Sequence, residues 1–207
     1  MLKIILSLLL ITLLYSFGNN YNSDVNSEAK KSIYSQFNSD VNQIEETLKF
    51  FTSITEGTAG IESNYTILRR QFKAAEPLLY YLFKDEYNRY LNGAPLPKLE
   101  PNVPELSIIQ PKGLQRLDEL MSEEHIDIEA INKIAKDMLT SMRYVKKMIA
   151  GIKIQDRYIL EATRIQLVRM ASLSLSGFDT PGGSNYLDDL KSNIQTLTFI
   201  FEKYEQD

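Results

Sequence analysis

The sequence predicts an all-α fold, a single bundle of about five to six helices with one long proline-rich crossover loop. Three observations lead to this prediction. Apolar residues recur every three or four positions through most of the chain, which is the helical period. Runs that alternate apolar and polar residues, as half-buried strands do, are scarce. Five of the seven prolines gather between residues 92 and 111, so one segment interrupts the helices.

Residues 1–18 have the pattern of a secretory signal peptide. Lys3 precedes a mainly apolar run, and Ser16 and Gly18 supply the small residues that a signal peptidase reads. The run is shorter than the roughly 20 residues that a membrane-spanning helix needs. We therefore expect export to a periplasm, a single mature domain over residues 19–207, and no membrane span after cleavage.

The composition excludes several classes of function. The chain has no cysteine, so disulfides, thiolate metal sites and covalent haem attachment are excluded. Its net charge is −4 and it has no basic block, which makes nucleic acid an unexpected partner. We expect no cofactor on this chain.

The first two helices are predicted over residues 27–54 and 61–91. The apolar residues of the first helix fall on one stripe, which is Ile33, Phe37, Val41, Ile44, Leu48 and Phe51. Gly57 and Gly60 end this helix and open a turn. The second helix carries aromatic residues towards its end.

The segment 92–111 is predicted to be an irregular loop. It contains five prolines, at positions 95, 97, 101, 104 and 111. Because proline lacks the backbone N–H that a helix needs, no helix crosses this segment. A loop of this length is uncommon in a compact domain, and it is either a crossover between helices or a functional contact surface.

Four further helices are predicted in the second half of the chain. The first three ranges are 113–121, 127–150 and 152–176, and the last helix starts at Thr180-Pro181 or at Ser184 and runs towards the end. Asp127 is the expected N-cap of the second of them, and Gly177 ends the third. The third is apolar on nearly all sides, so we expect it at the centre of the domain. The last is expected to pack through Leu187, Leu190, Ile194, Leu197 and Phe201.

Residues able to carry out catalysis are few. The only histidine, His125, lies among acidic residues ahead of a helix start, which is typical of a solvated loop. One histidine with surface carboxylates makes a weak metal site, and no Ser-His-Asp set can be assembled around it. We expect no catalytic residue and no metal ligand.

Charged residues on two predicted helices indicate a buried polar network. Arg69 and Glu76 share one otherwise aromatic face, and Glu161, Arg164 and Arg169 lie on the apolar helix 152–176. Burying such groups is costly unless they are paired. We predict that some of these five residues pair between helices, either as structural ion pairs or as a ligand or partner site.

Three segments resemble a bacterial protein family. They are Arg69-x-x-Phe72-Lys73-x-x-Glu76-x-Leu78-x-Tyr80; Asn92-Gly93-x-Pro95-Leu96-Pro97-x-Leu99-Glu100 with Ile109-x-Pro111-x-Gly113-Leu114-Gln115-x-Leu117-x-Glu119; and Arg169-Met170-x-x-Leu173-x-Leu175-x-Gly177-Phe178-Asp179-Thr180-Pro181. Together they resemble the helical N-terminal region that precedes the catalytic part of exported di-haem cytochrome-c peroxidases.

The resemblance implies an accessory module rather than an enzyme. Those peroxidases attach haem through Cys-x-x-Cys-His, which this chain lacks. It implies a haem-containing periplasmic partner, either a di-haem peroxidase or another electron-transfer protein, and any haem would lie on that partner. The implied contact residues are Asn92, Gly93, Pro95, Pro97, Pro111, Gly113, Gly177, Phe178, Asp179 and Pro181.

A fainter similarity offers a second hypothesis. The Arg-x-x-Phe-Lys-x-x-Glu helix is similar to imelysin-like helical proteins of the periplasm, although their Gly-x-His-x-x-Glu motif is absent. This similarity implies a binder of metal or free haem. Tyr80, Tyr81, Tyr87 and Tyr90 would supply oxygen ligands. An aromatic face packed within the bundle accounts for the same tyrosines.

Overall fold

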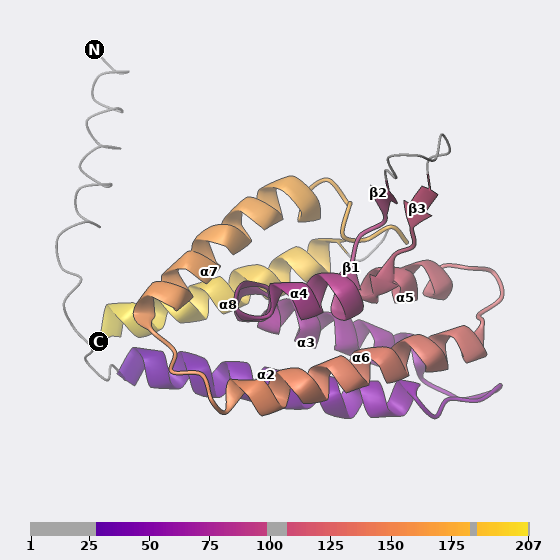
Figure 1. The fold of residues 1–207 in the computed structure, drawn as a ribbon, viewed down its shortest axis with the longest axis horizontal. Helices are drawn as coiled ribbons and strands as arrows, with labels where there is room; N and C mark the ends of the chain where they lie inside the picture. Colours follow the sequence, from indigo (N-terminus) through magenta and orange to yellow (C-terminus); the bar gives the residue numbers. More distant parts are fainter. Residues whose placement is uncertain (1–27, 99–106, 183–185, 207) are drawn as a thin grey trace, which may run out of the picture.

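The computed structural model describes residues 28–98, 107–182 and 186–206, and it shows an all-α fold (Figure 1). The long helices are α2 (Glu28–Phe51), α3 (Ile61–Leu82), α6 (Ile128–Ile149), α7 (Asp156–Arg169) and α8 (Tyr186–Gln206). The shorter ones are α4 (Lys84–Glu86), α5 (Leu114–Met121) and the π-helical turns η1 (Tyr87–Leu91) and η2 (Met170–Ser174). The predicted signal peptide lies outside the described residues.

Helix α3 lies at the centre of the bundle and packs against α2, α7 and α8. The apolar stripe predicted for the first helix is buried on α2, where it faces α3 and α6. Glu45 on α2 adds ion pairs to Arg143 at 3.5 Å and Lys146 at 2.7 Å on α6. Asp127 caps α6, as predicted, since its side chain accepts a hydrogen bond from the backbone N–H of Ala130. None of the helices in the described ranges is long and apolar enough to cross a bilayer.

The central position predicted for helix 152–176 is wrong. Helix α7 lies at the edge of the bundle (Figure 1), and Leu167, Val168 and Leu175 are 49%, 62% and 60% exposed. Its buried positions include Thr163 and Gln166, which are polar. Polar contacts with α3 determine which side of α7 is buried. Many apolar residues of α7 are therefore left on its solvent-facing side.

The core face predicted for the last helix is also wrong. Of its five residues only Leu197 is fully buried, and Leu187, Ile194 and Phe201 are each about half exposed or more. Helix α8 is rotated so that it buries polar residues instead, which are Asp189, Ser192 and Asn193. The rotation has a physical reason: charged side chains on α3 need polar partners, and α8 supplies them.

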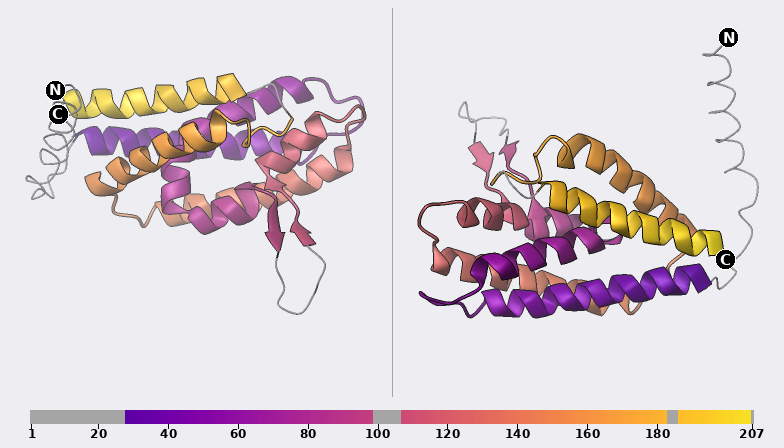
Figure 2. Two further views of the ribbon diagram at one scale, coloured as in Figure 1. Left: turned by 90° about the horizontal axis from the view of Figure 1, so that it is seen from above. Right: turned by 180° about the vertical axis from the view of Figure 1, so that it is seen from behind.

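The second helix ends earlier than predicted, and the segment after it contains strands. At Phe83 the backbone leaves the helical region, and the chain continues through α4 and η1. Segment 92–111 is not an irregular loop throughout. Strand β1 (Asn92–Gly93) pairs antiparallel with β4 (Lys112–Gly113), and β2 (Leu96–Lys98) pairs with β3 (Ser107–Ile109). Figure 2 shows β2 and β3 projecting from the helical body as a hairpin.

Glycine is required where β4 meets the end of η1. Gly113 has a φ of +59°, a region that side chains disfavour. A Cβ atom added there would lie 2.1 Å from the carbonyl oxygen of Leu91. The backbones can therefore approach closely only because position 113 has no side chain. This close approach fixes the foot of the hairpin against the helical body.

Asp40 on α2 is a buried carboxyl group whose charge is not balanced. It is 7% exposed and accepts a hydrogen bond from the Gln36 amide at 2.8 Å, and no cation of the described residues forms an ion pair with it. Burial raises the pKa of Asp40 to about 6 from 3.8, and the Gln36 hydrogen bond offsets only part of this effect. Between pH 3.8 and about 6, the Asp40 carboxyl group is therefore mostly protonated in the folded state and mostly ionised in the unfolded state.

Because the pKa of Asp40 is higher in the folded state, its ionisation lowers stability as pH rises from about 4 to 6. We expect Asp40→Asn to raise the free energy of unfolding by about 1–2 kcal/mol at pH 7.5 and to leave it unchanged near pH 4. Urea denaturation at both pH values measures this difference. Asp85→Asn, on the exposed helix α4, serves as the control. An equal effect of Asp40→Asn at both pH values would contradict the assignment.

Candidate functional site

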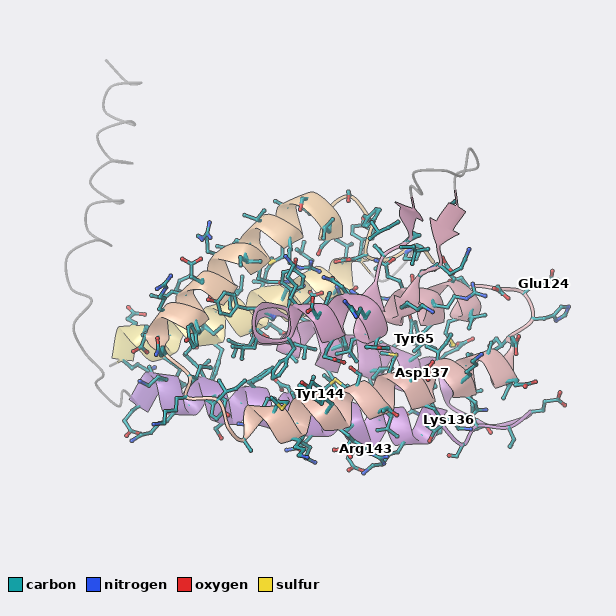
Figure 3. The ribbon with its side chains drawn as sticks, viewed as in Figure 1. Tyr65, Glu124, Lys136, Asp137, Arg143 and Tyr144 are labelled. Carbon is teal, nitrogen blue, oxygen red and sulfur yellow. The ribbon has the colours of Figure 1, made fainter. Side chains whose placement is uncertain are left out.

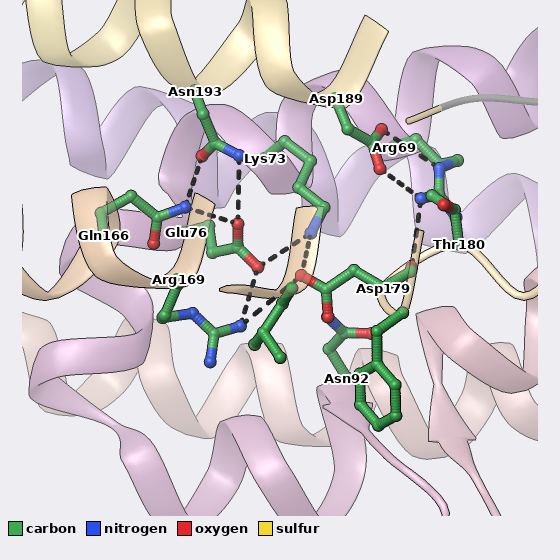
Figure 4. Close-up of polar contacts among 12 residues, drawn as sticks. Arg69, Lys73, Glu76, Asn92, Gln166, Arg169, Asp179, Thr180, Asp189 and Asn193 are labelled. Carbon is green, nitrogen blue, oxygen red and sulfur yellow. Dashed lines mark hydrogen bonds and ion pairs between the residues drawn. The ribbon is translucent and has the colours of Figure 1, made fainter. Parts of the chain in front are cut away.

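A network of charged and polar side chains occupies the centre of the bundle (Figure 4). Its members come from α3, η1, β1, α5, α7, α8 and the turn after η2. They are Tyr65, Arg69, Lys73, Glu76, Tyr87, Asn92, Asp118, Gln166, Arg169, Asp179, Asp189 and Asn193. All are at most 4% exposed except Arg169, whose side chain is 12% exposed. Such burial requires each charge to find partners.

Arg69 organises one half of this network. Its Nε donates to one carboxylate oxygen of Asp189 at 3.2 Å, and Nη2 donates to the other. Its Nη1 donates to Asp118 at 2.8 Å and to the Tyr65 hydroxyl at 2.9 Å. One guanidinium group therefore joins α3, α5 and α8. Asp118 also accepts from the backbone N–H of Gly182 at 2.7 Å, which anchors the turn before α8.

Glu76 organises the other half. Its carboxylate accepts hydrogen bonds from Lys73 at 3.0 Å and Gln166 at 2.9 Å, and longer ones of 3.4 Å from Arg169 and Asn193. The Tyr87 hydroxyl donates to it as well. Five donors from α3, η1, α7 and α8 thus converge on one carboxylate.

The electrostatics keep Glu76 and Lys73 ionised. Burial alone would raise the pKa of Glu76, but the nearby Lys73 and Arg169 cations outweigh it and lower this pKa to about 2. Burial likewise disfavours the Lys73 cation, yet Glu76 and Asp179 hold its pKa above the usual value. At neutral pH both groups are charged and paired.

Asp179 joins the two halves. Its carboxylate lies 3.3 Å from Lys73 Nζ and 3.9 Å from an Arg169 nitrogen, and its backbone carbonyl accepts from Arg69 at 3.5 Å. The sequence predicted Asp179 as a surface contact, but it is 4% exposed and its carboxylate pairs with cations of the core. The turn after η2 is thus held to the bundle by its own aspartate.

The structure brings together three of the five residues predicted for a polar network. Arg69, Glu76 and Arg169 belong to it, whereas Glu161 and Arg164 do not. The latter two form an i,i+3 ion pair at 2.8 Å on the surface of α7, with side chains 37% and 71% exposed. Because α7 lies at the edge of the bundle, these charges remain in water.

Sequence reasoning missed several members of the network. Lys73 had a usable signal, since it lies four residues after Arg69 and three before Glu76 on the same helix face. Asp189 and Asn193 are also four residues apart, but the more apolar stripe beside them on α8 suggested a different buried face. Asp118 had no signal, because its contact with Arg69 depends on how α5 folds back.

The predicted contact residues fall into two groups. Those that are buried are Asn92, Gly93, Pro111, Gly113 and Asp179, and Gly177 is partly buried; those that are exposed are Pro95, Phe178 and Pro181. Pro97 lies on β2. The Asn92 amide donates to the Tyr87 hydroxyl at 2.7 Å, so Asn92 ties the base of the hairpin to the polar network.

The four tyrosines proposed as haem or metal ligands do not form one cluster, although the Tyr80 and Tyr87 rings pack edge to face with centroids 5.1 Å apart. The Tyr87 hydroxyl is buried and bonded to Glu76, Arg169 and Asn92, and the Tyr80 ring lies 4.1 Å from the Arg169 guanidinium. Tyr81 packs against Tyr158, and Tyr90 is exposed.

The other potential metal ligands are also dispersed. In the part of the chain that the structure describes, no group of three histidine, aspartate or glutamate side chains is arranged to hold a metal ion. His125, the only histidine of the chain, is exposed. Its surroundings are those of a solvated residue between α5 and α6.

The projecting hairpin presents apolar side chains to solvent. Leu96 on β2 is 55% exposed, and Ile108 and Ile109 on β3 are 59% and 45% exposed. Tyr90, at the end of η1, is 46% exposed near the foot of the hairpin. Apolar side chains gathered on a projecting element are typical of protein contact surfaces. We call Leu96, Ile108 and Ile109 the hairpin patch.

A comparison of the sequence with protein-family models gave no match, and a comparison with curated proteins gave no significant match.

Proposed function

We propose that this chain is an exported, non-catalytic helical module that associates with a haem-bearing electron-transfer protein of the periplasm, such as a di-haem cytochrome-c peroxidase. The observation that carries the proposal is the hairpin patch, Leu96, Ile108 and Ile109, which projects from the bundle into solvent. Burying such side chains against a partner releases about 25 cal/mol per Å² of apolar surface.

The pairing of the buried charges within the core supports an interaction role for the surface. The buried charges are engaged with one another: Arg69 with Asp118 and Asp189, and Glu76 with Lys73. These groups stabilise the helical bundle and hold the hairpin in place. The exposed surface would then determine which partner the module binds.

The partner's chemistry comes from the sequence resemblance. The three segments that resemble the peroxidase region include β2, the end of β3 and the turn after η2. The hairpin and that turn are therefore the surfaces through which the module would contact its partner. Because the chain has no cysteine, a covalently bound haem would belong to the partner.

We expect Ile108→Ser to weaken binding of the haem protein at least tenfold, because it removes the most exposed apolar side chain of the hairpin patch. The measurement uses the tagged chain expressed in its native host. The haem protein that co-purifies is quantified by its Soret absorbance and identified by intact mass.

Phe201→Ser is the matched control. Phe201 is 52% exposed and lies near the end of α8, at the opposite end of the bundle from the hairpin (Figure 1). This variant should recover as much haem protein as the wild type. Equal recovery by both variants would overturn the role of the hairpin patch, and recovery of no haem protein by the wild type would overturn the proposed function.

A further inference from the structure

A second surface feature lies at the foot of the hairpin. It is a pocket of about 450 Å³ between η1, β4, α5 and α6. This volume falls within the roughly 300–1,000 Å³ typical of binding pockets. Its charged and aromatic lining is Arg89, Tyr90, Lys112, Arg116, Lys133 and Asp137. We call it the basic pocket.

The charges of the basic pocket are unbalanced. Four of its lining residues are cationic and one, Asp137 (Figure 3), is acidic. Arg116 is already paired with Glu119 at 2.7 Å. Arg89, Lys112 and Lys133 make no ion pair with any described residue. The pocket is therefore positively charged, whereas the whole chain has a net charge of −4. Such a surface attracts anions and repels cations.

Besides the charged residues, Gln110 and Gly113, the pocket has an apolar part of its lining. Tyr90, Pro111, Ala130 and Ile134 supply it. The cations therefore surround a surface that suits carbon chains as well as charge. An acidic peptide, whose carboxylates stand on apolar stems, matches both features. A bare inorganic anion would use the charge alone.

The basic pocket is continuous with the hairpin patch. Ile109 of the patch is followed directly by Gln110 and Pro111, which line the pocket. Lys112 begins β4, which pairs with β1 and closes the hairpin foot. A partner segment that covers the patch would therefore lead directly into the pocket.

We propose that the basic pocket binds an acidic peptide segment of the protein that covers the hairpin patch, with Arg89, Lys112 and Lys133 contacting its carboxylates. The identity of that protein rests on the proposed function, but the preference for carboxylates can be measured without it. Charge complementarity of this kind raises association rates and selects the partner.

The first test uses a fluorescently labelled glutamate-rich peptide and a lysine-rich peptide of equal length. Only the glutamate-rich peptide should bind, and its affinity should fall as salt is added, because exposed charges are screened. Lys112→Glu combined with Lys133→Glu should weaken its binding at least tenfold. A control pair, Lys147→Glu with Lys191→Glu, changes the net charge equally on exposed positions outside the pocket and should alter the affinity less than twofold.

Three results would overturn the proposal: no binding of the glutamate-rich peptide, an equal loss in both double variants, or full displacement by inorganic phosphate at the peptide's own concentration. The two proposals also fail separately. If the Lys112→Glu/Lys133→Glu variant binds the haem protein normally while Ile108→Ser does not, the pocket assignment alone fails. If the peptide binds but no haem protein is recovered, the proposed function alone fails.

Discussion

Replacing Glu76 by glutamine is expected to lower the free energy of unfolding by about 3 kcal/mol at pH 7, which corresponds to a melting temperature roughly 6–12 °C lower. Glutamine removes the charge that compensates Lys73 and Arg169. In the wild type the Glu76 carboxylate accepts hydrogen bonds from the amides of Gln166 and Asn193. In the variant, the NH₂ group of glutamine would face one of these donors and could not accept its hydrogen bond. Thermal and urea denaturation measure the change.

The effect of Glu76→Gln should depend on pH with a defined sign. The pKa of Glu76 is about 2 in the folded protein, below its ordinary value of 4.5, so its stabilising contribution is present above pH 4.5 and is lost as pH falls towards 2. The difference between wild type and variant should shrink in that window. Glu161→Gln, in the surface pair with Arg164, should change stability by less than about 1 kcal/mol. Equal effects of the two substitutions would refute the buried role of Glu76.

Replacing Arg69 by lysine is expected to cost about 2–4 kcal/mol although the charge is kept. The guanidinium of Arg69 contacts Asp189 through two nitrogens and reaches Asp118 and Tyr65 through the third. A single ammonium group cannot span these acceptors, so at least one buried carboxylate loses its partner.

Arg70→Lys supplies the control for that substitution. Arg70 is the next residue in the chain, but its side chain is 59% exposed and lies 4.0 Å from Asp188. The same chemical change should there alter the free energy of unfolding by at most about 0.5 kcal/mol. A difference of less than 1 kcal/mol between the two variants would contradict the bridging role of Arg69.

The helices that bury apolar stripes were predictable from the sequence. The stripe from Ile33 to Phe51 on α2 is buried as its spacing indicates, and Asp127 caps α6. The period of three to four residues suffices where a helix packs through apolar side chains. The same method failed for α7 and α8, because their orientation is determined by polar partners of α3.

The candidate site was predictable only in part, for a similar reason. Arg69 and Glu76 stand out because charges on an aromatic helix face must be paired if buried. Their partners Asp118, Asp179 and Asp189 come from α5, a turn and α8, and nothing local in the sequence distinguishes these aspartates from solvated ones. The strand pairs β1–β4 and β2–β3 were missed because prolines suggested an irregular loop, whereas two-stranded edges tolerate proline.

The network and the hairpin are parts of one arrangement. Asn92 at the base of the hairpin bonds to Tyr87, which bonds to Glu76, and Asp179 holds the turn after η2 to Lys73. The central charges thus position both the base of the hairpin and the turn after η2. Substitutions in the network should therefore weaken partner binding indirectly, through loss of structure, whereas Ile108→Ser should leave the melting temperature nearly unchanged.

The proposed binding of a haem-bearing electron-transfer protein is tested by the visible absorption spectrum of the wild-type chain, recovered from the periplasm of its native host. The intact masses of all co-eluting polypeptides are measured on the same sample. We expect a Soret band that belongs to a second polypeptide carrying covalently attached haem. A Soret band on this chain alone, or a colourless chain recovered without a partner, would contradict the proposed function.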